Sequence, residues 1–251
     1  MLEKIKGETA AKNPITFDPN HLNRIVLKGS ANNYTCYIAR PDVLPAPAVV
    51  VLHEVFGVNA DIRRHCDELA EKGFLAIAPD LFWRQEDDVD LSVRSDADWQ
   101  HGVKLYQAYD RDAGSGDVGD IVETVAKLPD CAGIVGLLGY CFGALMSFIS
   151  AARHRVDAVV AFHGAETEKY LGEAGGLNAP ILMHLAEEDE FISKPTQETI
   201  KAAMAKKPNA KVYSYPGQYH AFSRVNGLHY NAEAAALANG RTYEFLRQSL
   251  R

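Results

Sequence analysis

The chain has 251 residues, of which 47% are hydrophobic, and a formal net charge of −7. This balance is typical of a globular protein with a sizeable core. The negative charge argues against nucleic acid or an anionic membrane as a partner. No apolar run approaches the roughly 18–20 residues that a membrane-spanning helix needs.

The N-terminal sequence and the cysteines indicate a cytoplasmic protein. Residues 1–8 lack a hydrophobic signal core, so we do not expect secretion. Four cysteines are present without a CxxC pair, and we expect all of them to be reduced. The nine histidines are scattered and form no HExxH motif, so the sequence predicts neither a metal nor an organic cofactor.

Residues 1–23 are polar and mixed in character, and we expect an irregular arm there, followed by a single domain over residues 24–251. Apolar runs of strand length bounded by turn residues predict strands at 24–27, 34–39, 48–53, 74–78, 134–138, 158–162, 180–185 and 211–215. Helical periodicity predicts helices at 61–72, 99–110, 118–128, 144–153, 195–205 and 232–250. Residues 84–100 are acidic and predict an irregular surface segment.

Strands and helices alternate from residue 48 onward. The run at 48–53 is apolar throughout, which is typical of a parallel strand buried on both faces. We therefore expect an α/β fold with a mostly parallel central sheet and helices on both faces. The two earlier strands fit an antiparallel edge of that sheet.

The segment from Ile134 to Ala144 carries the first chemical motif. An apolar run stops at Gly139, a turn passes through Cys141, and a helical pattern starts after Gly143. This is the arrangement of a nucleophile elbow, with cysteine in the place where serine is commoner. Glycine is needed on both sides because the turn is too tight for side chains. The positive end of the following helix favours a thiolate.

A nucleophile of this kind needs a base, and the base needs an orienting acid. Asp189 and His220 each follow a predicted strand, at 180–185 and 211–215. Parallel strands bring their carboxyl ends to one sheet edge, where ligands bind. The order nucleophile, acid, histidine is that of the α/β-hydrolases. We therefore expect His220 to take the proton of Cys141 and Asp189 to orient the imidazole.

Glu54 follows the predicted strand at 48–53 directly. In α/β-hydrolases the loop after this strand supplies one backbone N–H of the oxyanion hole, and the residue after the nucleophile supplies the other. We assign these two donors to Val55 and Phe142.

Residues 48–250 resemble the dienelactone hydrolases, or carboxymethylenebutenolidases. The matching segments are His-Glu-Val-Phe-Gly-Val-Asn at 53–59, Ala-Pro-Asp-Leu-Phe at 78–82, Gly-Tyr-Cys-Phe-Gly at 139–143 and Tyr-His-Ala-Phe-Ser-Arg at 219–224. The resemblance implies an α/β-hydrolase fold and a triad of Cys141, Asp189 and His220.

The same resemblance implies roles for two further residues. Glu54 would contact the resting thiol and help to form the thiolate once substrate binds. Arg224, four residues after His220, would bind a carboxylate of the substrate.

One part of the family pattern is missing. Dienelactone hydrolases have a second carboxylate-binding arginine, and a tyrosine four residues later, ahead of the segment that is Lys104 to Asp110 here. These two positions hold Trp99 and Val103. Arg94 is a candidate replacement for the missing cation. Trp99 indicates a more apolar pocket for the acyl or alcohol group, and we include it among the substrate-binding residues.

Some of these residues also have a purely structural interpretation. Cys141 has a buried core position as its alternative, because free cysteines are often core residues. Asp189 lies in an acidic cluster that would ordinarily be solvated surface, and Glu188 is its rival. His53 and His163 each lie at the end of a predicted strand, and we interpret them as pocket walls or packing residues.

The two charged residues have alternatives as well. Glu54 has the alternative of a simple ion pair with Arg63 or Arg64. Arg224 has the alternative of an ordinary surface charge.

We therefore predict a monomeric hydrolase that cleaves ester or lactone bonds of a small molecule through a thioacyl-enzyme at Cys141. A first alternative is a general carboxylesterase or thioesterase with a less anionic substrate, which Trp99 and Val103 favour. A second alternative is a non-hydrolytic protein that uses Cys141 as a redox sensor or binds a ligand.

Overall fold

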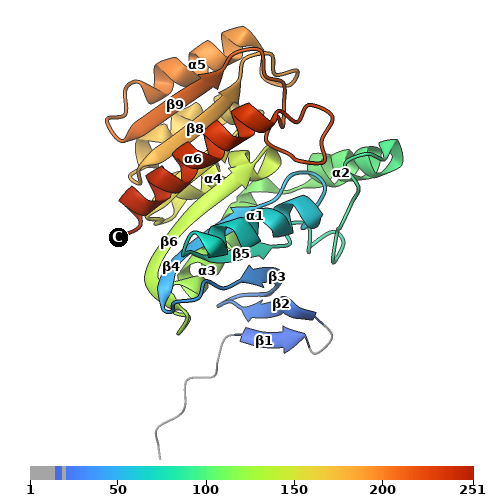
Figure 1. Ribbon diagram of the computed structural model, residues 1–251, viewed down its shortest axis with the longest axis vertical. Coiled ribbons are helices and arrows are strands. Elements are labelled where there is room, and N and C mark those ends of the chain that lie inside the picture. The colour runs from blue at the N-terminus through green and yellow to red at the C-terminus, as the bar shows by residue number, and fades with distance from the viewer. Residues whose placement is uncertain (1–14, 19–20) are drawn as a thin grey trace, which may run out of the picture.

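The computed structural model describes residues 15–18 and 21–251. A nine-stranded sheet runs through the molecule in the order β1-β2-β3-β5-β4-β6-β7-β8-β9 (Figure 1). The strands are β1 Ile15–Asp18, β2 His21–Lys28, β3 Asn33–Ala39, β4 Ala46–Leu52, β5 Leu75–Pro79, β6 Cys131–Tyr140, β7 Ala158–Phe162, β8 Ile181–Ala186 and β9 Ala210–Tyr215. Pairing is antiparallel from β1 through β3 to β5, and parallel among β5, β4 and β6 to β9.

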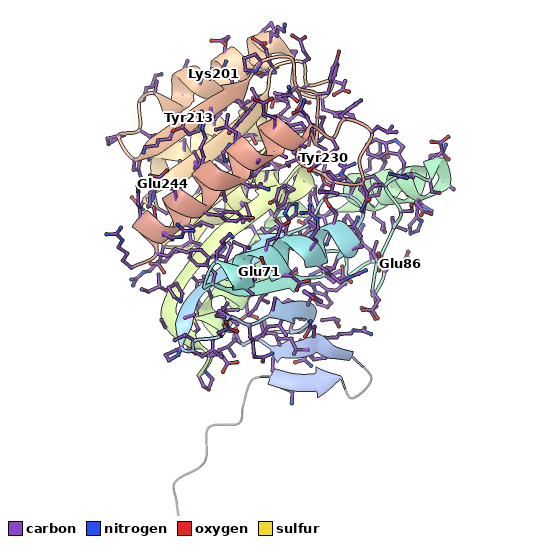
Figure 2. The ribbon with its side chains drawn as sticks, viewed as in Figure 1. Glu71, Glu86, Lys201, Tyr213, Tyr230 and Glu244 are labelled. Carbon is purple, nitrogen blue, oxygen red and sulfur yellow. The ribbon has the colours of Figure 1, made fainter. Side chains whose placement is uncertain are left out.

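Helices cover both faces of this sheet, as the alternation along the sequence predicts. The α-helices are α1 Ala60–Glu71, α2 Asp96–Ala108, α3 Arg111–Val125, α4 Phe142–Arg153, α5 Lys194–Met204 and α6 Ala232–Ser249. A 3-10 helix, η1, covers Thr167–Gly176. Charged side chains such as Glu71 and Glu244 lie exposed on the outer surfaces of α1 and α6 (Figure 2). Among the residues described, no helix combines the length and apolarity needed to cross a membrane.

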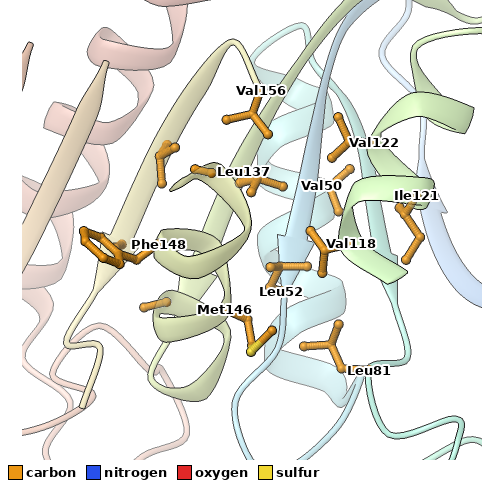
Figure 3. Packing of buried hydrophobic residues seen from close by; sticks show 14 of the residues in the cluster. Val50, Leu52, Leu81, Val118, Ile121, Val122, Leu137, Met146, Phe148 and Val156 are labelled. Carbon is orange, nitrogen blue, oxygen red and sulfur yellow. The ribbon is translucent and has the colours of Figure 1, made fainter. Parts of the chain in front are cut away.

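Strand β4 shows why the central strands are apolar throughout. Val49 and Val51 pack into the cluster that α1 and α6 cover, whereas Val50 and Leu52 pack into the cluster of α3, α4 and α5 (Figure 3). Successive side chains of a strand point to opposite faces, so burial of both faces requires an apolar residue at every position. The α/β-hydrolase fold predicted from the sequence is confirmed.

The prediction of an irregular arm over residues 1–23 is wrong for part of that range. Ile15–Asp18 forms strand β1, which pairs with β2, and β2 itself starts at His21. A boundary at residue 24 therefore falls inside β2. The β-branched and aromatic residues of Ile-Thr-Phe favour a strand, and β2 offers a free edge to pair with. Residues 1–14 and 19–20 lie outside the described part of the chain.

Two helices, α2 and α3, begin three or more residues earlier than predicted. Helix α2 starts inside the acidic segment, where the Ser95 hydroxyl accepts from the backbone N–H of Asp98. Helix α3 starts at Arg111 because Asp110 caps it, although glycines at 114, 116 and 119 weaken its helical propensity. At Gly119 a Cβ atom would lie 2.6 Å from Nδ1 of His154, so a larger residue there would displace the His154 ring.

Candidate active site

Cys141 lies in the tight turn between β6 and α4, with φ 51° and ψ −112°. A non-glycine residue with such a φ is strained, and strain of this kind gathers at functional sites. A Cβ on Gly139 would lie 2.1 Å from the Gly143 carbonyl oxygen, and one on Gly143 would lie 2.0 Å from that of Leu52. Both glycines of the predicted elbow are therefore required by space.

Cys141 is also the N-cap residue of α4. Its carbonyl oxygen accepts from the backbone N–H of Ala144 (3.0 Å) and Leu145 (3.2 Å), but its side chain makes no capping hydrogen bond. The sulfur therefore stays available at the positive end of the helix, where a thiolate is stabilised. Cys141 is half-buried, whereas the other three cysteines are buried and all four are free thiols.

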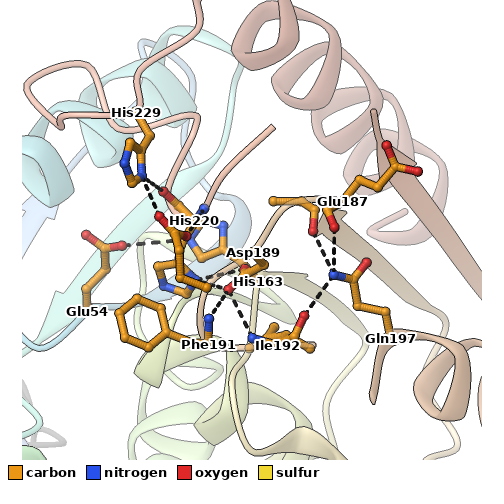
Figure 4. Close-up of polar contacts among 12 residues, drawn as sticks. Glu54, His163, Glu187, Asp189, Phe191, Ile192, Gln197, His220 and His229 are labelled. Atoms are coloured by element: carbon orange, nitrogen blue, oxygen red, sulfur yellow. Dashed lines mark hydrogen bonds and ion pairs between the residues drawn. The ribbon is translucent and has the colours of Figure 1, made fainter. Parts of the chain in front are cut away.

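The structure brings Asp189 and His220 together as predicted. Nδ1 of His220 lies 2.8 Å from Oδ2 and 3.0 Å from Oδ1 of Asp189 (Figure 4). The backbone N–H groups of Phe191 and Ile192 also donate to Oδ1 of Asp189. Burial would raise the pKa of the Asp189 carboxyl, but His220 and these donors outweigh it and lower the pKa. Asp189 is thus a fixed anion that orients the imidazole.

The second ring nitrogen of His220, Nε2, is the one available for proton transfer. Nε2 is buried and has no hydrogen-bond partner in the described part of the chain. Burial lowers the pKa of His220, yet the nearby Cys141 and Asp189 raise it more, to about 10. The raised pKa favours the imidazolium form of His220, which is the form that can give a proton.

The rival acid, Glu188, is engaged elsewhere. Its Oε1 accepts from Nζ of Lys194 at 2.8 Å, at the surface.

Glu54 forms a buried ion pair with Arg224. Nη2 of Arg224 donates to Oε1 at 2.8 Å, and Nε lies 2.7 Å from Oε2. Burial would raise the pKa of Glu54, but the Arg224 charge and then His163 bring it well below its usual range. The two arginines suggested as alternative partners bind elsewhere, Arg63 to Asp90 and Arg64 to Asp61 and Glu68.

The resemblance implied a contact between Glu54 and the resting thiol of Cys141. In the described chain Glu54 makes no hydrogen bond to Cys141, and its carboxylate lies on Arg224 instead. A charge-assisted hydrogen bond together with a second ion contact to the same guanidinium is stronger than the bond that a carboxylate makes with a thiol, which accounts for this geometry.

Val55 and Phe142 lie beside Glu54 and Cys141, where the sequence placed the two oxyanion donors. Within the described residues, neither backbone N–H donates a hydrogen bond to another group. Unpaired N–H groups at this point of the fold can donate hydrogen bonds to an oxygen that develops negative charge.

The loop after β4, which carries Val55, is fixed by contacts on two sides. Nε2 of His53 accepts from the backbone N–H of Leu81 (2.9 Å), so Nδ1 carries the proton that is donated to the Glu54 carbonyl oxygen (2.6 Å). Helix α2 approaches so closely that a Cβ on Gly102 would lie 2.2 Å from the Val55 carbonyl oxygen. His53 is therefore a packing residue, as predicted, and it fixes the loop.

Trp99 lies on α2 near the site. Its ring contacts those of Phe56 (5.8 Å between centroids) and Phe191 (6.0 Å). Arg94, the candidate replacement cation, donates from Nε to the carbonyl oxygen of Asn226 at 3.2 Å.

Sequence reasoning underestimated His163. It is buried, its ring centroid lies 4.5 Å from that of His220, and its Nε2 lies 3.7 Å from Oε1 of Glu54. Neither ring nitrogen has a hydrogen-bond partner among the described residues, and φ is 41°. Burial and then the charge of His220 lower its pKa to about 4. Its position at the end of an apolar strand was the only signal available in the sequence.

Glu190 and Phe191 were also missed. Oε2 of Glu190 accepts from the backbone N–H of His220 (3.0 Å), and Oε1 lies 3.3 Å from Nδ1 of His229. Phe191 lies edge-on against the His220 ring. Their only signal in the sequence was adjacency to Asp189.

Comparison with known proteins agrees with this geometry. Residues 34–250 match the model of the dienelactone hydrolase family. The chain is 37% identical to a candidate carboxymethylenebutenolidase of Azospirillum brasilense (88% of this chain, 96% of that protein) and 34% identical to the carboxymethylenebutenolidase of Pseudomonas putida (86% and 91%). A crystal structure of a candidate dienelactone hydrolase of Klebsiella pneumoniae superposes with a TM-score of 0.77 at 28% identity, covering 88% of this chain and 95% of that one. The chain is therefore a hydrolase that belongs to the dienelactone hydrolase family.

Proposed function

We propose that the chain hydrolyses carboxylic esters and lactones through a thioacyl-enzyme on Cys141. The observation that carries this proposal is the strained Cys141 beside a buried His220–Asp189 pair, all at the carboxyl ends of sheet strands. The relatives named carboxymethylenebutenolidases support the same class of reaction.

In this proposal the Cys141 thiolate attacks the ester carbonyl, and its oxygen becomes an oxyanion held by the N–H groups of Val55 and Phe142. The intermediate collapses as the His220 imidazolium gives its proton to the leaving oxygen. Water then gives one proton to the now neutral His220 while its oxygen attacks the thioester carbonyl carbon. The C–S bond breaks, the acid is released, and the Cys141 thiolate and His220 imidazolium are restored. Asp189 holds one tautomer of His220 throughout.

Arg224 is the proposed anchor for a substrate carboxylate. Glu54 occupies its Nε and Nη2, and no bond to Nη1 is found among the described residues. Its guanidinium lies over the Phe56 ring, 5.0 Å from the centroid. A carboxylate approaching Nη1 would meet a cation that is already fixed in place.

A general carboxylesterase or thioesterase is the second candidate. Two observations favour it: Glu54 already balances the charge of Arg224, and Trp99 stands where the family has a second arginine. Both reduce the attraction for a strongly anionic substrate.

We also propose that the protein acts as a monomer in the cytoplasm. The four free cysteines support a reducing compartment. Gel filtration with light scattering tests the oligomeric state, and a mass near twice 27.6 kDa contradicts a monomer.

The test is hydrolysis of 4-nitrophenyl acetate and of a dienelactone by wild type, Cys141→Ala and the matched control Cys131→Ala. We expect wild type and Cys131→Ala to turn over and Cys141→Ala to be inactive. Turnover of both substrates supports a dienelactone hydrolase, and turnover of the neutral ester alone supports the second candidate. Full activity in Cys141→Ala contradicts the nucleophile. Inactivity of wild type toward every ester, with peroxide oxidation of Cys141, transfers support to a redox role.

A further inference from the structure

A line of aromatic rings leads outward from the catalytic histidine. The Phe191 ring stands edge-on to His220, with centroids 4.8 Å apart and planes at 75°. Trp99 lies 6.0 Å beyond Phe191, and Phe56 lies 5.8 Å from Trp99. The three aromatic residues come from the loop after β8, from α2 and from the loop after β4. Three separate parts of the chain thus contribute to one line of rings that begins at His220.

The exposed fraction of each ring shows whether it is a core residue or is available to contact a ligand. Phe56 is 2% exposed, as expected for a core residue, whereas Trp99 is 38% and Phe191 is 55% exposed. Large apolar side chains that stay in contact with water beside a catalytic residue are typical of a ligand-binding surface. Trp99 and Phe191 therefore present exposed aromatic surface, and Phe191 contacts the buried His220 directly.

The chemistry assigns this surface to one part of the substrate. The carbonyl oxygen faces the N–H groups of Val55 and Phe142, and the carbonyl carbon faces Cys141. His220 delivers its proton to the leaving oxygen, so the group bonded to that oxygen lies on the His220 side. Because Phe191 contacts the His220 ring, the leaving group is the part of the substrate that meets Phe191 and Trp99.

We propose that Trp99 and Phe191 form a leaving-group subsite, and that the enzyme prefers esters and lactones whose leaving oxygen carries an aromatic or similarly flat apolar group. This inference rests on the proposed ester hydrolysis through Cys141 and His220. Edge-on and offset ring contacts supply the attraction, in addition to the burial of apolar area.

The first test compares three neutral esters: benzyl acetate, ethyl acetate and ethyl phenylacetate. We expect kcat/KM for benzyl acetate to exceed that for ethyl acetate by about tenfold, because a ring contact and its burial together give roughly that factor. We expect ethyl phenylacetate, whose ring is on the acyl side, to lack this advantage. In Trp99→Ala and in Phe191→Ala the ratio of benzyl to ethyl acetate should fall to within about twofold of unity.

Leu237→Ala is the matched control, because Leu237 is an exposed apolar residue of α6, 49% exposed. We expect it to keep the wild-type ratio. An unchanged ratio in both Trp99→Ala and Phe191→Ala overturns the subsite. A preference for ethyl phenylacetate over benzyl acetate overturns its assignment to the leaving group.

A binding measurement makes the inference independent of turnover. Nitroaromatic compounds quench tryptophan fluorescence, and the chain has two tryptophans, Trp83 and Trp99. We expect 4-nitrobenzyl alcohol to quench Cys141→Ala saturably, and Cys141→Ala/Trp99→Phe to lose that saturable part. Saturable quenching together with an inactive wild type would support binding at Trp99 and Phe191 and contradict the proposed ester hydrolysis. Active wild type without saturable quenching keeps the hydrolysis and rejects the subsite.

Discussion

His163 directly follows strand β7, and His184 lies on the neighbouring strand β8. Both histidines are buried, yet their surroundings differ completely. The backbone N–H of His163 donates to the carbonyl oxygen of His184 at 2.8 Å. Both ring nitrogens of His184 are bonded, Nδ1 to the Tyr215 hydroxyl (2.7 Å) and Nε2 to that of Thr242 (3.0 Å). Both ring nitrogens of His163 lack a partner among the residues described.

The difference separates the interior from the catalytic edge of the sheet. Five non-glycine residues of the described chain have a positive φ, and four of them follow the carboxyl ends of β6, β7 and β9: Cys141, His163, Glu166 and Ala221. The fifth is Asp88. Strain and unpaired polar groups cost stability, so they persist where the surrounding fold enforces them, and such places are active sites. The hydrogen bonds around His184 stabilise the fold, whereas the strained and unpaired groups around His163 and Cys141 lie where we propose that catalysis takes place.

Apart from substitution of Cys141 itself, the largest effect expected at the catalytic edge comes from Asp189→Asn. The amide keeps the shape of the carboxylate but loses the charge that orients and stabilises the His220 imidazolium. We expect kcat/KM to fall by about 10³-fold or more, with the fold retained by circular dichroism. Glu188→Gln is the matched control beside it and should stay within about twofold of wild type. Loss of activity in Glu188→Gln with retention in Asp189→Asn would reverse the assignment of the acid.

The Glu54–Arg224 pair gives the next effect, on stability. Arg224→Met leaves the buried Glu54 charge without its cation, so we expect the free energy of unfolding to fall by about 3 kcal/mol. The double variant Glu54→Gln/Arg224→Met removes both charges and should recover most of that loss. Urea unfolding measures all three proteins. A single variant as stable as wild type would show that the pair is solvated and not buried.

Substitutions at His163 and at a hydrogen-bond partner of His184 test the comparison between the two histidines. His163→Phe replaces two unpaired nitrogens with an apolar ring of similar shape, so we expect the protein to gain about 1 kcal/mol of stability. We expect its kcat to fall, because Glu54 loses the imidazole beside it. Thr242→Val removes a partner of His184 and should cost about 1 kcal/mol with kcat unchanged. Thermal unfolding and ester turnover measure both, and a less stable His163→Phe contradicts this account.

The pH dependence of stability gives the smallest effect. Burial lowers the pKa of His163 to about 4 and that of His184 to about 3, from an ordinary 6.5. The pKa values in the folded protein lie below the pKa of about 6.5 in the unfolded chain. The folded state is therefore most stable, with respect to these two histidines, above about pH 6.5, and it loses stability as pH falls toward 4 and 3. His220 behaves in the opposite way: its raised pKa, about 10, stabilises the fold below pH 6.5 and that contribution is lost as pH rises through 10.

Unfolding free energies measured from pH 3 to 10 check this pattern. Between pH 6.5 and 4, His163→Phe should lose stability less steeply than wild type, by at most about 1.4 kcal/mol per pH unit for one proton. Equal slopes would show that His163 titrates normally in the folded protein.

The fold was predictable where the pattern along the chain is strong. The apolar run of β4 and the glycines around Cys141 each have one physical explanation, and the structure agrees with both. Strand β1 and the start of α3 were not predictable, because pairing with β2 and close packing outweigh their weak local signals.

Some features of the site were also predictable from the sequence, and others were not. Asp189 and His220 were predictable because strand order brings the ends of β8 and β9 to one edge. The pairing of Glu54 with Arg224, the unpaired state of His163 and the edge contact of Phe191 depend on side-chain packing between distant segments. No local pattern in a single sequence records such packing.

The most direct test of the central claim is intact mass spectrometry of the enzyme, quenched with acid during turnover of a slowly deacylating ester. The account predicts a mass increase equal to one acyl group, located by digestion on the peptide that contains Cys141 and absent from Cys141→Ala. Steady turnover with no acyl adduct, or an adduct that persists in Cys141→Ala, would contradict it.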